Sequence, residues 1–207
     1  MHHRFVCAII LVSMVLAGCG RLGSEKTFDA ACKKLLELKS YTCDVTMKVM
    51  NNKSTMEYKM KHFYISPGKY RVEVVEPEEL KGQVTIYDGE HSYIYHPKIN
   101  AQLVTENFPD SLECDAFIGS FISRFKDMKN VKITKEKDND NLYMLEFEVP
   151  EPNSYKVLER LWIDTLNAVP VKAEIYGADG KTTVSIRYTN FGYNPKLNER
   201  DFEIIKR

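Results

Sequence analysis

The sequence has 207 residues with 29 basic and 29 acidic side chains, so its formal net charge is zero. Hydrophobic residues make up 43% of the chain, which is enough for one folded domain with a substantial core. The basic residues form no long run. A neutral chain without a basic patch lacks the charge that nucleic-acid binding requires, so no nucleic-acid partner is expected.

The amino end has the order of a secretory signal peptide. Arg4 precedes an apolar run over residues 5–16, which is too short to span a bilayer as a helix. The next small residues complete Leu16-Ala17-Gly18-Cys19, which resembles a bacterial lipobox. The resemblance implies that residues 1–18 are removed and that Cys19 carries a diacylglycerol anchor at the extracytoplasmic face of the cell membrane. The alternative is an ordinary cleavage site beside an incidental cysteine.

A short tether and a helix are predicted after the cleavage site. Residues 19–26 form the lipidated tether, and residues 27–207 form one domain, since no linker divides them. Apolar residues recur at helical spacing from Thr27 to Lys39, which predicts a helix with one buried face. This apolar stripe consists of Phe28, Ala31, Cys32, Leu35 and Leu38.

From Thr42 the hydrophobic period changes to two, which is typical of half-buried strands. Residues 42–49 and 56–60 are predicted to form a hairpin around the turn at 51–53, and residues 70–74 a third strand. Successive strands with one apolar side predict an antiparallel sheet that is packed on one face.

The stretch Gln83–Pro97, QVTIYDGEHSYIYHP, contains the strongest turn signal in the chain. Asp-Gly between two β-rich runs predicts a hairpin, because glycine tolerates the positive φ of the turn. A two-residue turn places Val84 opposite Tyr93, whereas a wider loop over residues 88–91 places Val84 opposite Tyr95. Both registers keep the same side chains on one face, namely Val84, Ile86, His91, Tyr93 and Tyr95.

Residues 111–128 return to helical spacing and carry a wide apolar stripe that we expect to pack on the sheet. Gly119 within this stripe indicates close packing. Alternating segments follow between residues 131 and 189, and Phe202 to Ile205 could add a last short strand. The sequence therefore predicts an α+β domain: a curled antiparallel sheet of roughly ten strands, covered by two helices.

Three cysteines remain after processing if Cys19 is acylated, so at most one disulfide can form within the chain. Cys32 lies in the helical stripe and Cys43 on the apolar side of a strand. We interpret both as small core residues in preference to a bridge. Cys114 lies between two acidic residues, whose charges disfavour a reactive thiolate.

The sequence offers no constellation of catalytic or metal-binding residues. His62, His91 and His96 lack the spacing of zinc ligands. Residues 138–141 begin like a calcium loop, but a tyrosine follows where that loop needs glycine. The nucleotide-binding and serine-hydrolase fingerprints do not occur. We therefore expect no enzymatic activity, no metal and no cofactor.

The order of the motifs resembles the LolA/LolB/LppX group of lipoprotein and lipid carriers. The lipobox, a PGKYRVE run, the IYDGEHSYIYHP hairpin and a later LWIDTLNAVPVKAEIY run follow one another over nearly the whole mature chain. This resemblance implies an unclosed β-barrel whose apolar concave face receives acyl chains in the carriers. Among anchored relatives, the chain is most similar to the GerS-like germination lipoproteins of spore-forming clostridia. That similarity implies a non-enzymatic partner of a cortex peptidoglycan amidase.

Two functions are competing hypotheses. As an adaptor, the protein would use an exposed sheet edge or loop to bind a cell-wall amidase, or a second copy of itself as a homodimer. As a carrier of the LolB or LppX kind, it would bind lipid or lipoprotein acyl chains, unless Phe117, Phe121 and Phe125 fill the concavity. The candidate ligand- or partner-binding residues are Met47, Met56, Tyr58, Met60, Leu80, Tyr93 and Tyr95.

Overall fold

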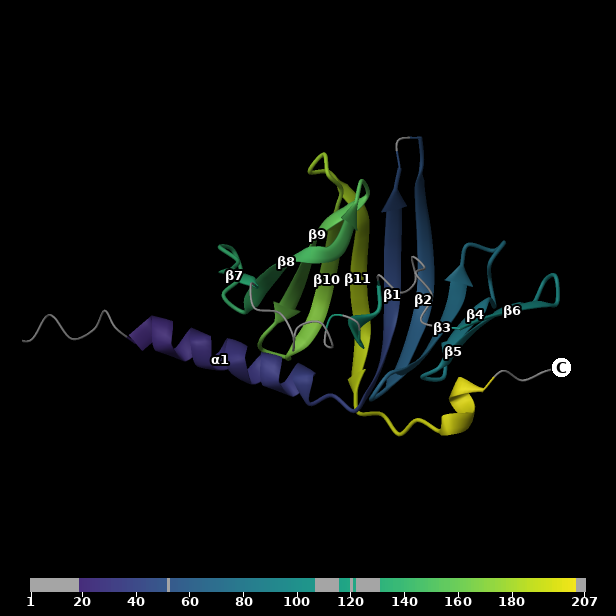
Figure 1. Ribbon diagram of the computed structural model, residues 1–207. Helices are drawn as coiled ribbons and strands as arrows, with labels where there is room; N and C mark the ends of the chain where they lie inside the picture. Colours follow the sequence, from purple (N-terminus) through teal and green to yellow (C-terminus); the bar gives the residue numbers. More distant parts are fainter. Residues whose placement is uncertain (1–18, 52, 107–115, 120, 122–130, 204–207) are drawn as a thin grey trace, which may run out of the picture.

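The computed structural model describes residues 19–51, 53–106, 116–119, 121 and 131–203. In these ranges the chain forms one antiparallel sheet of 11 strands, in the order β6-β5-β4-β3-β2-β1-β11-β10-β9-β8-β7 (Figure 1). All neighbours except β1 and β11 are consecutive in the chain. The sheet therefore consists of two meanders, β1–β6 and β7–β11, which meet where β1 pairs with β11.

The first meander contains β1 (Ser40–Met50), β2 (Thr55–Ile65), β3 (Lys69–Glu76), β4 (Val84–Tyr87), β5 (His91–His96) and β6 (Ala101–Glu106). The second contains β7 (Lys132–Lys135), β8 (Leu142–Asn153), β9 (Lys156–Asp164), β10 (Val169–Tyr176) and β11 (Thr182–Tyr193). Helix α1 (Cys19–Leu36) precedes the sheet, and a short 3-10 helix, η1 (Glu199–Phe202), follows it.

Helix α1 begins at Cys19, eight residues earlier than predicted, and ends before β1. Residues 19–26 are thus helical and span about 12 Å along the axis, not the extended path expected of a tether. No proline interrupts these residues, so the helix can continue through them. At the other end, the backbone N–H groups of Lys39 and Ser40 donate to Asn194 Oδ1 at 2.9 and 3.1 Å, which fixes the entry into β1. The division into tether and domain stays a prediction.

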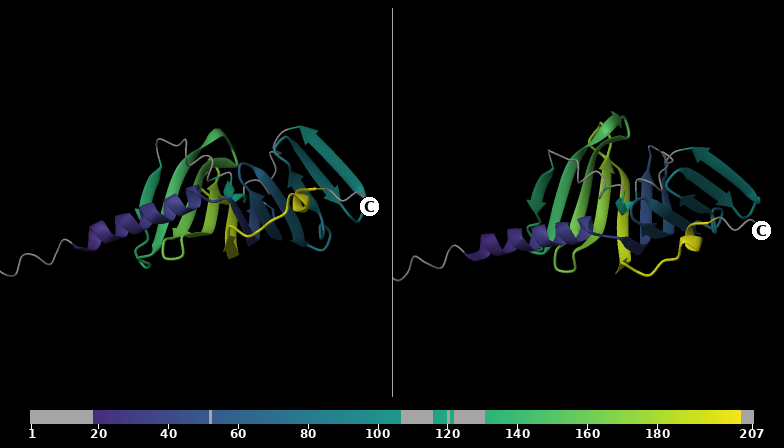
Figure 2. Two further views of the ribbon diagram at one scale, coloured as in Figure 1. Left: turned by 90° about the horizontal axis from the view of Figure 1, so that it is seen from below. Right: turned by 60° about the horizontal axis from the view of Figure 1, so that its bottom comes forward.

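Helix α1 packs on the face of the sheet that carries the core (Figures 1 and 2). The five residues of its predicted apolar stripe are all buried, which confirms the amphipathic pattern. Phe28 stacks on Tyr143 of β8, with 4.9 Å between the ring centroids. Cys32 and Cys43 are free and buried, as predicted, and burial raises the pKa of the Cys32 thiol to about 12. Both thiols therefore behave as small apolar groups.

The predicted helix at 111–128 lies mostly outside the described residues. Within it, residues 118, 119 and 121 are helical, and Phe117, Ile118 and Phe121 are buried in the core. The Tyr188 hydroxyl donates to the Ala116 carbonyl at 3.1 Å and ties this segment to β11. A Cβ atom on Gly119 would lie 2.4 Å from Cε1 of Phe117, so the predicted close packing is confirmed.

The Asp-Gly hairpin is confirmed, with the wider of the two predicted loops. Val84 lies opposite Tyr95, and Ile86 lies opposite Tyr93. The Asp88 carboxylate accepts from the backbone N–H groups of Glu90 and His91 at 2.9 and 2.8 Å. These side-chain bonds stabilise the four-residue loop, because they satisfy two backbone donors within it.

The sheet is open, as predicted, and its two edges, β6 and β7, lie far apart (Figure 1). It is not strongly curled, so that part of the prediction is wrong. Of the residues predicted to add a last short strand, Phe202 instead ends η1, and residues 204–205 lie outside the described part of the chain. The segment after β11 crosses to the other face of the sheet, where the Arg71 Nη1 donates to the Asp201 carbonyl at 3.1 Å and Phe202 is buried. Phe202 thereby covers part of the face that α1 leaves open.

Candidate functional site

The predicted methionine and tyrosine lining divides into buried and exposed parts. Met47 of β1 and Met60 of β2 are each 1% exposed and belong to the core. Met56 is 47% exposed at the start of β2, and Tyr58 is partly buried, with its hydroxyl 3.6 Å from the Met56 sulfur. Leu80 does not protrude, because it packs against the core. Tyr58 packs against the core as well, so among these five residues only Met56 is exposed.

The core face leaves little room for an acyl chain between the described residues. The Phe117 ring packs against Tyr41, Tyr64 and Tyr70 at centroid distances between 4.8 and 5.9 Å. A cavity of about 30 Å³ lies between α1 and strands β8 to β10. It is lined by Cys32, Leu35, Leu36, Ile118, Phe121, Leu145, Phe147, Leu161, Ile163 and Pro170. A space of this size holds a water molecule or two.

Tyr93 and Tyr95 lie on the face opposite the buried methionines. The cross-strand register places His62, Val72 and Thr85 in one row, and this row lies on the core face. Ile86 and Tyr93 occupy the alternate positions and therefore point to the outer face. The seven predicted residues accordingly do not form one site.

His62 is the most isolated polar side chain in the described part of the core. It is fully buried, and neither ring nitrogen has a hydrogen-bond partner. Its strand neighbours opposite are Cys43 and Val72, and the Phe117 ring centroid lies 6.4 Å away. This burial lowers the pKa of His62 from 6.5 to about 3, so the imidazole is neutral at physiological pH.

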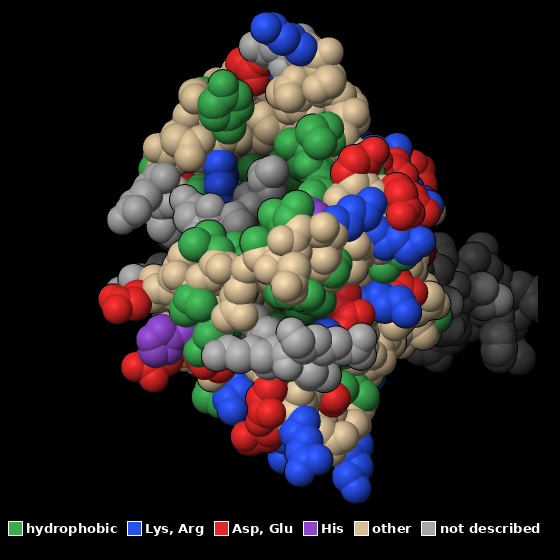
Figure 3. Space-filling model, turned by 90° about the vertical axis from the view of Figure 1, so that its right-hand side faces the viewer, with side chains coloured by type: hydrophobic (Ala, Val, Ile, Leu, Met, Phe, Trp, Pro, Cys, Tyr) green, Lys and Arg blue, Asp and Glu red, His purple; other side chains and the backbone are tan. Residues whose placement is uncertain are grey.

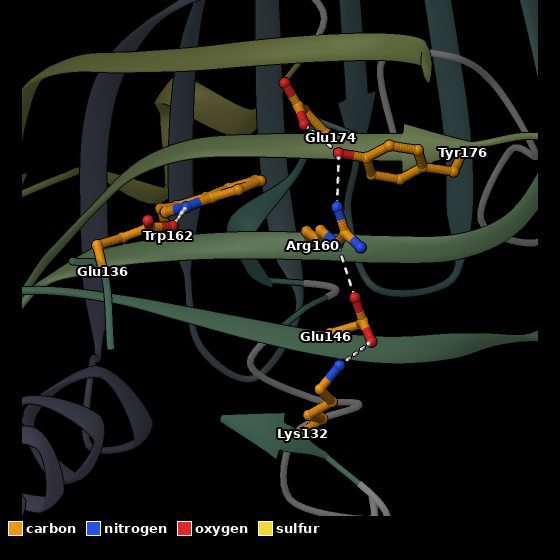
Figure 4. Close-up of polar contacts among 7 residues, drawn as sticks. All are labelled: Lys132, Glu136, Glu146, Arg160, Trp162, Glu174 and Tyr176. Atoms are coloured by element: carbon orange, nitrogen blue, oxygen red, sulfur yellow. Dashed lines mark hydrogen bonds and ion pairs between the residues drawn. The ribbon is translucent and has the colours of Figure 1, made fainter. Parts of the chain in front are cut away.

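The outer face of the second meander carries a row of paired polar groups across β7 to β10 (Figure 4). Arg160 donates from Nε to Glu146 at 2.7 Å and from Nη1 to the Tyr176 hydroxyl at 3.1 Å. Lys132 lies 3.4 Å from Glu146, and the Tyr176 hydroxyl donates to Glu174. The hydrogen bond from Arg160 lowers the pKa of the Glu146 carboxyl. Each charge has a partner, so the row connects strands and leaves no ligand-binding group free.

Trp162 extends the same row toward the carboxyl end of β9. Its indole N–H donates to Glu136 at 2.6 Å, and Lys172 Nζ lies 4.5 Å above the ring centroid. The side chain is 8% exposed. A tryptophan this well covered cannot serve as a flat stacking platform for a ligand.

The two edges of the sheet differ in character. Strand β6 has six residues without a lysine or proline, and its adjacent Leu103 and Val104 are 57% and 48% exposed. Strand β7 has four residues, begins and ends with lysine, and exposes Ile133 at 48%. Short edge strands with lysines resist pairing with another chain, whereas a longer apolar edge invites it. The sequence signal for this edge was the Leu103-Val104 pair in an otherwise polar strand, which we did not select as a candidate.

No cluster of metal-ligating side chains occurs in the part of the chain that the structure describes. None of the described helices is both long and apolar enough to cross a membrane. The lipidation site predicted at Cys19 lies at the first residue of α1, and its side chain is outside the described part.

Comparison with solved structures defines the class of this fold. A chain in the complex of the CwlD amidase with the GerS lipoprotein from Clostridioides difficile is 25% identical, with a TM-score of 0.54, over 82% of this chain and 95% of that chain. An uncharacterised conserved protein from Thermus thermophilus is 11% identical, with a TM-score of 0.58, over 89% and 95% of the two chains. A LolA superfamily protein from Nitrosomonas europaea matches more weakly, at 15% identity and a TM-score of 0.46, over 85% and 97%. The open sheet is thus of the fold class that the first two of these structures share.

Within that class the chain belongs to the YdcC-like sporulation protein family, which matches residues 2–202. No functionally curated protein matches the sequence. The predicted resemblance to GerS-like lipoproteins is confirmed.

Proposed function

We propose that this protein is a membrane-anchored, non-enzymatic adaptor that binds a cortex peptidoglycan amidase in spore germination. The observation that carries the proposal is the likeness to a structure in which GerS is in complex with the CwlD amidase. Membership of a sporulation family supports the same context. In this role the chain contributes binding surface, and the amidase contributes the chemistry.

The fold is suited to such a role because it exposes an edge. One face of the sheet is occupied by the core, and the outer face of the second meander by paired charges. Among the described strands, β6 has no neighbour on its outer side. A rigid sheet with an open edge can hold a partner by strand pairing without a preformed pocket.

The membrane anchor is the second part of the proposal. The lipobox motif at residues 16–19 supports acylation at Cys19. Two or three acyl chains on one cysteine hold a protein stably, whereas one chain would be reversible. The amidase would accordingly be held at the extracytoplasmic face of the cell membrane.

The experiment is a binding measurement between the mature chain carrying Cys19→Ser and purified CwlD from Clostridioides difficile. We expect co-elution in size-exclusion chromatography and a saturable heat signal in calorimetry. Capture of the lipidated protein from sporulating cells should return the cell's own amidase. Absence of an amidase from that capture, together with no binding to CwlD, would refute the adaptor function.

The alternative function, carriage of lipid or lipoprotein acyl chains, gains no support from the described residues. The cavity beside α1 has room for a water molecule or two, and Phe117 and Phe121 occupy the core face. Native mass spectrometry of detergent-free Cys19→Ser protein would test this directly. A mass increment equal to a phospholipid would favour the carrier function over the adaptor.

A further inference from the structure

We propose that the edge of β6 that no described strand covers receives an extended segment of the partner. This segment carries lysine or arginine residues and pairs with β6 as an additional strand. This inference rests on the proposed function, because the partner is taken to be the amidase. It specifies the surface, the conformation and the charge of the segment that binds.

The backbone of β6 supplies the hydrogen-bonding groups. Strand β6 pairs with β5 from Ala101 to Glu106 in an unbroken antiparallel register. In such a pair every second residue directs its N–H and C=O toward β5, and the residues between direct theirs outward. Five of the six residues are exposed, and among the described strands none pairs with the outer side of β6.

Apolar side chains flank this edge on both faces of the sheet. Val104 lies opposite Tyr93 on the outer face, with Tyr95 one pair further along the same face. Leu103 lies opposite Ile94 on the other face. Figure 3 views the molecule from this side and shows hydrophobic side chains gathered between charged groups. A strand that pairs with β6 would have apolar neighbours on both faces of the sheet. This environment fits a segment with small or apolar side chains on its two faces.

The charge around the edge selects the sign of the partner. Residues 77–106 contain five acidic and two basic side chains, a net charge of −3, whereas the whole chain is neutral. Both basic residues, Lys81 and Lys98, lie within 4 Å of Glu78. Glu79 and Glu106 are exposed and form no ion pair with the described residues. The negative charges of these two side chains favour the binding of a basic segment and disfavour the binding of a second copy of the same edge.

The opposite edge provides a matched control. Val104 on β6 and Ile133 on β7 are both edge residues and both 48% exposed. A lysine at either position should fold equally well, because each side chain is already half in solvent. A lysine on β6, however, adds charge and a long side chain to the proposed docking strand.

The first test compares Val104→Lys with Ile133→Lys in binding to CwlD from Clostridioides difficile. We expect Val104→Lys to weaken binding by about tenfold or more and Ile133→Lys by less than about twofold. Hydrogen exchange of the wild-type complex should show new protection in a peptide that covers residues 101–106. Circular dichroism and thermal melts confirm that both variants are folded.

The second test concerns charge. Glu79→Gln with Glu106→Gln removes the two acidic groups that form no ion pair with the described residues, and Glu37→Gln with Glu203→Gln removes two at exposed positions elsewhere. We expect the first pair to weaken binding several-fold at low salt and to flatten its salt dependence, and the second pair to do neither.

The outcomes separate this inference from the proposed function. Binding of CwlD without protection of residues 101–106, or with equal effects of the two lysine variants, would overturn the docking strand and leave the adaptor function standing. Absence of any binding by the wild type would overturn both. Sedimentation that shows a dimer which Val104→Lys dissociates would overturn the basic partner, since the edge would then bind a second copy.

Discussion

The buried imidazole of His62 predicts how stability depends on pH. Its folded pKa is about 3, against 6.5 for an exposed histidine, so the unfolded chain binds a proton that the folded chain excludes. Stability is therefore fully present above about pH 6.5 and is lost as the pH falls toward 3. Each pH unit in this window costs about 1.4 kcal/mol, or about 2 kcal/mol between about pH 7.5 and about pH 5.

His62→Leu removes this proton-linked loss and keeps the site apolar. We expect the free energy of unfolding of His62→Leu, relative to wild type, to rise by about 2 kcal/mol when the pH is lowered from about 7.5 to about 5. The neighbouring Cys43 thiol and Tyr64 hydroxyl stay uncharged over this range, because burial raises the pKa of each further above an ordinary value that is already above neutral pH. Carboxylates elsewhere affect both proteins equally and cancel in the comparison.

Urea titrations at the two pH values measure this difference. Val72→Ala is the control, because Val72 lies directly opposite His62 in the core and does not titrate. It should lower stability by the same amount at both pH values. If wild type and His62→Leu lose stability in parallel between these pH values, then His62 is not buried as a neutral ring, and the reasoning fails.

Three further predictions concern packing, electrostatics and anchoring. Gly119→Ala should destabilise the protein by about 1–3 kcal/mol in urea titration, since its Cβ would meet the Phe117 ring at 2.4 Å. Glu146→Gln should cost on the order of 1 kcal/mol near neutral pH, because it removes the partner of Arg160. The cost should fade as acid protonates the Glu146 carboxyl, whose pKa lies below its usual value. Cys19→Ser should abolish palmitate labelling and move the protein from the detergent phase to the aqueous phase of a Triton X-114 partition.

Each of these has a control or a contrary result. Gly68→Ala, at a glycine with open space around it, should change stability little. A neutral or stabilising Gly119→Ala would show that the Phe117 ring can move aside. A cost of Glu146→Gln that grows in acid would contradict the pairing with Arg160. Palmitate labelling that persists in Cys19→Ser would place the lipid elsewhere.

Much of the fold could be predicted because its strands alternate strictly. Strands β1 to β3 and β8 to β11 pack one face on the core, so period two is visible in the sequence. Asp88 and Gly89 located the hairpin for a local steric reason. The sequence did not determine the length of the loop. The choice between the two registers depends on the Asp88 side chain, which accepts from two backbone N–H groups.

The face of that hairpin could not be predicted from its pattern. Polar Thr85 and Ser92 are buried on the core face, whereas the apolar Ile86 lies on the outer face. Ile86 is nevertheless 1% exposed, on the side of the sheet that η1 and the buried Phe202 occupy. Phe202 lies more than a hundred positions after Ile86 in the sequence, so the local hydrophobic period could not show that both are on the same side of the sheet. Tyr93 and Tyr95 lie on the same face of the sheet as Ile86, so the candidate binding residues are divided between the two faces.

The junction of β1 with β11 has a consequence for how the molecule assembles. Each meander consists of neighbouring hairpins, so it can form by closing short loops. The pairing of β1 with β11, in contrast, joins strands that are separated by most of the domain. We expect this junction of β1 with β11 to form last and to set the folding rate. A circular permutant opened between β6 and β7, with its native ends joined, would bring β1 and β11 close together in the sequence. It should fold faster and keep every strand in place.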